Sequence, residues 1–162
     1  MKELPASKLD PRVKNIWRIT DSLWTVFAMA CVMLVTLPVA SLSGDGVIRT
    51  AITVELVVLV AALAFVLFAL PSIRYVRWRY EVSPEYLDIA KGIIWRKRYV
   101  IPFIRVQNTD TRQGPIMRAF GLASVTVATA AKEHEIPGLD FAVAEELRDR
   151  AAELARLARE DV

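Results

Sequence analysis

Two long apolar runs in the first half of the chain constrain its fold more than any other feature. No charged residue occurs from Leu23 to Ala40 or from Leu56 to Leu70. A helix of roughly 20 apolar residues spans the hydrocarbon core of a bilayer, because backbone polar groups there must be paired within the segment. The sequence therefore predicts two transmembrane helices, at about residues 22–41 and 48–70.

A cleaved signal peptide is the alternative for the first run, since Pro38-Val39-Ala40-Ser41 resembles a small-residue cleavage site. The run is longer than the roughly 7–15 apolar residues of a signal peptide, and Asp10 and Asp21 precede it. These observations favour a spanning helix. The single cysteine, Cys31, lies inside this run, so the chain cannot form an internal disulfide.

Cationic residues beside the two runs predict the orientation of the hairpin. They are Lys2, Lys8, Arg12, Lys14 and Arg18 before the first run, and Arg74, Arg77 and Arg79 after the second. The connection at residues 41–46 is short, with only Arg49 near it. Because Lys and Arg favour the cytoplasmic side, both termini should face the cytoplasm. We expect a multi-pass plasma-membrane protein with a cytoplasmic segment at 1–21, a hairpin at 22–70 and a cytoplasmic domain at 71–162.

The second half of the chain alternates like a β-sheet and ends in a helix. We expect strands at 79–83, 86–90, 93–102, 104–112 and 124–130, a weak strand at 134–136, and a helix at 141–159. Asp140 should cap that helix. Its apolar face should consist of Val143, Leu147, Ala151, Leu154 and Ala158. This order predicts an α+β domain, a small curled sheet or open barrel closed by the terminal helix.

The stretch at residues 101–122 predicts a corner between two sheets. Pro115 can begin a short helix and Gly121 can end it in a left-handed conformation. Ile116, Met117 and Phe120 should then face the core. Gln107, Gln113 and Arg118 are the polar residues left to hold this structural corner together.

Several motifs in this half resemble those of one family of bacterial membrane proteins. They are Tyr80-x-Val82, Tyr86-Leu87-x-Ile89-x-x-Gly92, Ile101-Pro102-x-x-Arg105-Val106-Gln107, Gln113-Gly114-Pro115-x-x-Arg118-x-x-Gly121-Leu122, Val125-x-Val127-x-Thr129-Ala130 and Ile136-Pro137-Gly138-Leu139. In combination they are similar to the pleckstrin-homology-like (PH-like) membrane proteins of the YdbS type. The resemblance implies a two-helix anchor and a PH-like fold of two bent sheets closed by a C-terminal helix. That fold usually has seven strands, whereas the sequence pattern predicts about six. Six and seven strands are therefore alternatives, and they differ in how the barrel closes near residues 131–137.

The sequence offers little for catalysis or for a cofactor. His134 is the only histidine, and its neighbours Glu133 and Glu135 favour a solvated turn. Paired histidine or cysteine ligands, a Gly-rich phosphate loop and a nucleophile elbow do not occur in the sequence. We therefore expect no enzyme activity, no metal and no cofactor.

Charge is distributed unevenly along the second half. Residues 74–118 carry ten Lys/Arg and four Asp/Glu, a net charge of +6, whereas residues 119–162 carry five and nine, a net charge of −4. Anionic lipids attract cations that lie near the membrane surface. We predict a membrane or partner surface formed by Arg74, Arg77, Arg79, Arg96, Lys97, Arg98 and Arg105. Ordinary positive-inside topology is the alternative explanation for the first three.

Glu55 is an intramembrane polar residue, about a turn inside the second predicted span. Such a carboxylate is costly unless it is paired or hydrated. It should lie at the outer headgroup level, and contact with a polar group on a partner helix is the alternative.

These features favour a non-catalytic, membrane-anchored interaction module that binds a protein partner, anionic lipid or both at the inner membrane face. The alternative is a small accessory subunit that contacts a larger membrane complex, or another membrane protein, through its helices. Nucleic-acid binding would need aromatic rings beside cations, which Trp95 and Tyr99 supply. Proximity to the membrane argues against it, and we expect no nucleic-acid partner.

Overall fold

The computed structural model describes residues 5–160 and contains two helices long and apolar enough to cross a membrane. α1 (Val13–Ser41) has a mean hydropathy of 2.2, and the second span (Asp45–Arg77) has one of 2.8. The second span consists of α2 (Asp45–Ala64), the π-helix η1 (Phe65–Ala69) and α3 (Leu70–Arg77). Lys2 of the predicted cationic flank lies outside the described residues.

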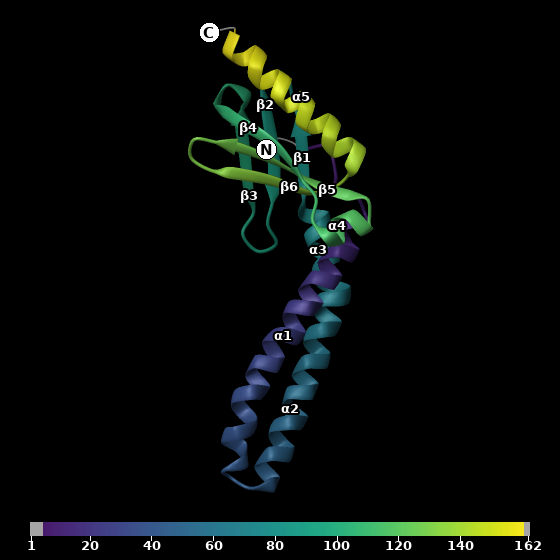
Figure 1. Cartoon of the computed structure of the whole chain (residues 1–162), viewed down its shortest axis with the longest axis vertical. Coiled ribbons are helices and arrows are strands. Elements are labelled where there is room, and N and C mark those ends of the chain that lie inside the picture. Colours follow the sequence, from purple (N-terminus) through teal and green to yellow (C-terminus); the bar gives the residue numbers. More distant parts are fainter. Residues whose placement is uncertain (1–4, 161–162) are drawn as a thin grey trace. The chain divides into compact units, whose positions relative to one another are not determined.

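The chain divides into two compact units, which we name the hairpin (residues 17–72) and the sheet unit (residues 5–16 and 73–160). In the hairpin, α1 and α2 run side by side in opposite directions (Figure 1). The sequence assigned the first 21 residues to a separate segment. The structure instead groups residues 5–16 with the strands and the terminal helix.

The sheet unit has the predicted α+β architecture (Figure 1). One antiparallel sheet has the order β1-β2-β3, with β1 at Arg79–Val82, β2 at Tyr86–Lys91 and β3 at Lys97–Pro102. The other has the order β4-β5-β6, with β4 at Val106–Arg112, β5 at Leu122–Thr129 and β6 at Glu133–Asp140. Within the described residues the two sheets stay separate, which makes a split barrel.

The described residues form six strands, and the N-terminal segment pairs with one of them. The weak strand expected at 134–136 is the full strand β6, which gives six strands in the described residues. Ser7 forms an isolated antiparallel bridge with Tyr80 of β1, and each N–H donates to the other residue's carbonyl over 3.0 Å. The N-terminal segment therefore pairs with the edge of the first sheet, where no strand was predicted.

The strand predicted at 93–102 begins only at Lys97, because Gly92 turns the chain. Gly92 has φ +114°, and a Cβ at this position would lie 2.0 Å from the carbonyl oxygen of Trp95. Residues 92–96 therefore form a tight turn that requires glycine at position 92. Arg96, which the predicted strand included, therefore lies outside β3.

The terminal helix α5 (Phe141–Glu160) is confirmed, but its buried face is shifted from the predicted one. The Asp140 carboxylate accepts the Ala142 N–H over 3.1 Å, as expected of an N-cap. The buried residues are Ala144, Leu147, Ala151 and Ala155. Val143 was wrongly assigned to the core, since it is 44% exposed, and Leu154 and Ala158 are half-buried. The small alanine side chains permit a close approach to the sheets, with Leu147 as the one large side chain among the buried residues of α5.

The core of the sheet unit includes residues from the first helix. Phe103, in the 3-10 turn η2 (Phe103–Arg105), is fully buried with Leu87 and Ile136. Val13 at the start of α1 is also fully buried, against Gly138. Gly138 has φ +63°, and a Cβ there would lie 2.1 Å from a Val13 methyl. The N-terminal segment is therefore part of the packed fold.

Candidate functional site

Basic side chains from α3, β1, β2 and β3 gather around a cavity of about 470 Å³ in the sheet unit. We call it the basic cavity. It is lined by Val76, Arg77, Arg79, Ala90, Lys91, Gly92, Arg96, Lys97 and Arg98. Every ionisable side chain on its wall is a cation. Such an arrangement attracts an anion and disfavours a cationic ligand or a metal ion.

Strand register explains why these residues meet. Arg79 pairs with Ala90, and Lys91 pairs with Lys97. The start of β1, the end of β2 and the start of β3 therefore lie at one end of the first sheet. α3 ends at Arg77, two residues before β1 begins, so its last turn lies at the same end.

Three of the cations are already engaged within the sheet unit. The Arg98 guanidinium donates to both oxygens of Asp88, which is only 2% exposed, at 2.6–3.1 Å. These hydrogen bonds raise the pKa of Arg98. Arg79 donates to the carbonyls of Tyr75 and Trp78 at the end of α3, at 3.4 and 2.7 Å. The Lys91 ammonium lies 5.3 Å from the centre of the Trp78 ring. These contacts hold the three side chains in place on the wall of the basic cavity.

The remaining cations are available to a ligand. Arg77, Arg96 and Lys97 are exposed, and within residues 5–160 their side chains make no hydrogen bond or ion pair. An arginine presents several fixed N–H donors, which match the oxygens of a phosphate or carboxylate. The part of the basic cavity formed by Arg77, Arg96 and Lys97 is therefore suited to an oxyanion.

The predicted basic surface is divided by the structure. Arg77, Arg79, Arg96, Lys97 and Arg98 line the basic cavity, whereas Arg74 is half-buried in α3 and is not part of its wall. Arg105 lines a second cavity of about 440 Å³. Lys91 was missed as a site residue, although its position directly before a glycine turn could have placed it beside Arg96 and Lys97.

His134 was wrongly predicted to be a solvated turn residue. It lies buried in β6 and lines the second cavity, with its ring centre 4.8 Å from that of Tyr99. Burial lowers the pKa of His134, and the nearby charges of Lys132 and Lys91 lower it further. Within residues 5–160, no group of three His, Cys, Asp or Glu side chains could hold a metal ion.

The structural corner contains the predicted short helix, α4 (Pro115–Ala119), which begins at Pro115 and is followed by Gly121 at φ +64°. Gln113 donates its side-chain N–H to the Leu122 carbonyl over 3.0 Å. Gln107 lies at the opposite end of β4, beside the shift in register between Val106 and Asn108. Arg118 is exposed. Ile116, Met117 and Phe120 are half-buried.

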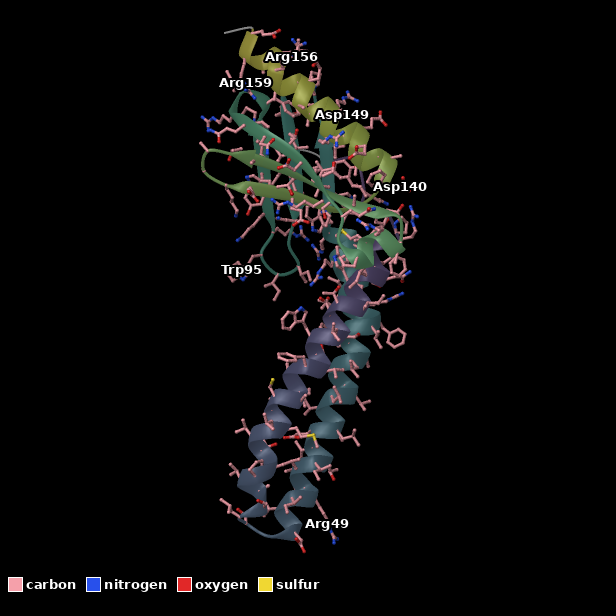
Figure 2. The ribbon with its side chains drawn as sticks, viewed as in Figure 1. Arg49, Trp95, Asp140, Asp149, Arg156 and Arg159 are labelled. Atoms are coloured by element: carbon pink, nitrogen blue, oxygen red, sulfur yellow. The ribbon has the colours of Figure 1, made fainter. Side chains whose placement is uncertain are left out.

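The cation that joins this corner to other segments is Arg12, which was predicted only as a charge beside the first span. Its guanidinium donates to Asp10 over 2.9–3.0 Å, to Asp140 over 2.7 Å and to the Phe120 carbonyl over 3.1 Å. The hydrogen bonds from Arg12 lower the pKa of both carboxyl groups. Asp140 lies at the start of α5 (Figure 2). Only the tertiary structure brings these distant residues together.

Glu55 contacts the other helix of its own hairpin. The Thr36 hydroxyl donates to one of its carboxylate oxygens, and the second oxygen is buried without a partner among the described residues. Glu55 lies ten positions after Asp45, which corresponds to about 15 Å along an α-helix. A cavity of about 240 Å³ next to it is lined by Val26, Met29, Ala30, Met33, Ile52, Leu56 and Leu59.

Comparison with known proteins identifies the family. The family model described as "Bacterial PH domain" matches residues 23–155. The chain belongs to the bacterial PH domain family. It is 34% identical over 170 aligned residues to the UPF0699 transmembrane protein YdbS of Bacillus subtilis (strain 168), and the alignment covers all of both chains. No solved structure matches it.

These matches confirm the resemblance to YdbS-type proteins that the motifs indicated. The match extends over the hairpin as well as the sheets, because it begins at residue 23. A bacterial PH domain in a chain with two candidate spans, and with a transmembrane relative, makes this protein a membrane-associated module.

Proposed function

We propose that this protein is a non-catalytic, membrane-anchored PH-domain module that binds anionic lipid headgroups at the inner membrane face through its basic cavity. The observation that carries the proposal is the cavity wall, where Arg77, Arg96 and Lys97 have no partner within residues 5–160 and no carboxylate competes for them. The oxygens of an anionic headgroup would accept hydrogen bonds from these three cations. An acidic segment of a partner protein is the other ligand for this surface.

Neutralising two of the free cations should weaken lipid binding without unfolding the protein. Full-length protein in detergent would be titrated with dihexanoyl phosphatidylglycerol and, for comparison, dihexanoyl phosphatidylcholine. We expect wild type to prefer the anionic lipid, and Arg96→Gln/Lys97→Gln to lose roughly tenfold in affinity at low salt. Binding by wild type should also fall as salt rises, because the attraction is screened. Thermophoresis of labelled protein measures all of these affinities.

The matched control removes two charges elsewhere in the same unit. Arg112 and Arg150 are exposed and are not part of the cavity wall, so Arg112→Gln/Arg150→Gln should retain the preference for phosphatidylglycerol. Equal losses in both variants would mean that net charge alone attracts the lipid. Salt-insensitive or absent binding by folded wild type would contradict the lipid proposal and favour a protein partner.

The hairpin supports a second candidate function, that of an accessory subunit in a larger membrane complex. Glu55 keeps one buried oxygen unpaired, and the cavity beside it is almost entirely apolar. A polar group on a neighbouring helix would satisfy that oxygen. If a partner co-purifies with wild type but is lost from Glu55→Leu, the hairpin carries the contact. Retention of the partner by that variant would favour the sheet unit instead.

The proposal requires both termini to be cytoplasmic. Reporter fusions at residues 1 and 162 should each report the cytoplasm, and a fusion at Gly44 in the connection should report the outside. The physical reason is the excess of Lys and Arg before the first span and after the second, compared with the connection between them. An exported C-terminus would contradict this topology and favour the signal-peptide alternative.

A further inference from the structure

The turn between β2 and β3 presents two large apolar side chains to solvent. Ile94 is 84% exposed and Trp95 is 80% exposed, the highest values for large apolar residues within residues 78–160. Figure 2 labels Trp95 beside this turn, away from the strands. Exposing both costs hydrophobic free energy, so a surface that covers them would be favoured.

The chain reverses tightly between β2 and β3. Gly92 permits a reversal within five residues, because it has a positive φ and no Cβ to meet the Trp95 carbonyl. At its base, the Lys91 ammonium lies 5.3 Å from the Trp78 ring centre and 5.8 Å from that of Tyr99. Ile94 and Trp95 therefore lie at the tip of a short reversal whose base is in contact with two aromatic rings.

Cations surround this apolar tip. Lys91 precedes it, Arg96, Lys97 and Arg98 follow it, and the sequence from Ile89 to Arg105 contains no acidic residue. An apolar tip flanked by cations matches a bilayer surface that contains anionic lipid, where tryptophan favours the headgroup level. A single-stranded nucleic acid would need several exposed rings. Tyr99 is half-buried against His134, so the tip offers only one.

Strand register places this tip at the end of the first sheet where the chain enters β1 from α3. Arg79 follows α3 directly and pairs with Ala90, one residue before Lys91. Val76 and Arg77, at the end of the second candidate span, line the same cavity as Arg96 and Lys97. The turn thus lies at the end of the sheet to which the span is covalently attached.

We propose that the Ile94–Trp95 turn inserts into the headgroup region of the inner leaflet and forms a second membrane contact besides the hairpin. The inference rests on the proposed function, because it assumes that the basic cavity faces the same lipids. The inserted side chains would hold the cavity at headgroup level, and the flanking cations would remain at the surface.

The test uses full-length protein with a Cys31→Ala background and one labelled cysteine. Ile94→Cys carries an NBD fluorophore, and Glu85→Cys is the control, since Glu85 is exposed in the turn at the opposite end of the first sheet. Both are reconstituted in nanodiscs of phosphatidylcholine, with and without phosphatidylglycerol. We expect the label at 94 to be blue-shifted, quenched by doxyl-labelled lipid and several-fold less accessible to aqueous iodide than the label at 85.

A second pair of variants tests the role of the tryptophan. Adding Trp95→Asp to the Ile94→Cys protein should return the label to water, whereas adding Leu157→Asp, at an exposed position on α5, should leave it inserted. The proposal is overturned if the labels at 94 and 85 are equally accessible to iodide. It is also overturned if the label at 94 is shielded from iodide without doxyl quenching, because a protein contact then covers it.

The two proposals can fail separately. Insertion in both types of nanodisc, without a preference for phosphatidylglycerol in the short-chain lipid titration, would retain the inserted turn and reject the lipid-binding cavity. A clear preference with a solvent-exposed label would reject the inserted turn and retain the cavity.

Discussion

Leu147→Asp should unfold the sheet unit. Leu147 is 8% exposed on the inner face of α5, between Ala144 and Ala151. The substitution removes a packed side chain and places a carboxylate at a buried position, at a cost of about 4 kcal/mol or more. That is a large part of the roughly 5–15 kcal/mol by which a domain is stable. Limited proteolysis of the full-length variant in detergent should show rapid cleavage after residue 72.

Val143→Asp is the matched control, one helical turn earlier on the same helix. Its side chain is 44% exposed, so the new carboxylate stays hydrated and proteolysis should remain close to wild type. The sequence pattern had placed both residues on one buried face, and this pair therefore separates the observed face from the predicted one. Equal resistance of Leu147→Asp and wild type would mean that α5 is not packed on the sheets.

The second large effect concerns the N-terminal segment. A fragment of residues 73–162 should not fold, because it lacks the buried side chains of Leu9, Val13 and Ile16. Burial of three such side chains contributes roughly 5–9 kcal/mol. A protein in which a flexible Gly/Ser linker of about 20 residues replaces the hairpin (residues 17–72) retains this segment and should fold.

Circular dichroism melts of the two soluble proteins measure this effect. The linked protein should unfold cooperatively, and the fragment should show no transition. Gly138→Ala in the linked protein tests the same contact at one position, because its Cβ would meet Val13 and its φ is +63°. Alanine is strained there, and a marked fall in melting temperature is expected. A cooperative melt of residues 73–162 alone would contradict the role of the N-terminal segment.

Features that depend on neighbouring residues were predicted well. The two apolar runs, the strong strands, the Asp140 cap and the short helix Pro115–Ala119 each depend on side chains within a few positions of one another. The start of β3 was predicted four residues too early, since Ile93, Ile94 and Trp95 all favour strands. The backbone geometry at Gly92 overrides that preference, because it reverses the chain before pairing can begin.

The basic cavity was only partly predictable. Clustered charges in the sequence predicted most of the cations that line it. The sequence pattern could not show that Arg98 is engaged by the buried Asp88 while Arg96 and Lys97 are free. Pairing across β2 and β3 decides that difference. Arg105 carries the same charge, yet it lies at another cavity because η2 turns the chain between the two sheets.

The chain's local patterns suffice for its class: two membrane-length helices, antiparallel strands and a terminal amphipathic helix follow from hydropathy and periodicity within short windows. The tertiary structure alone decided which segments complete the core. Val13 against Gly138, Ser7 beside Tyr80 and Arg12 between Asp10 and Asp140 join residues up to 128 positions apart. No short-range pattern encodes such contacts, because they depend on where the folded sheets bring the two ends of the sequence.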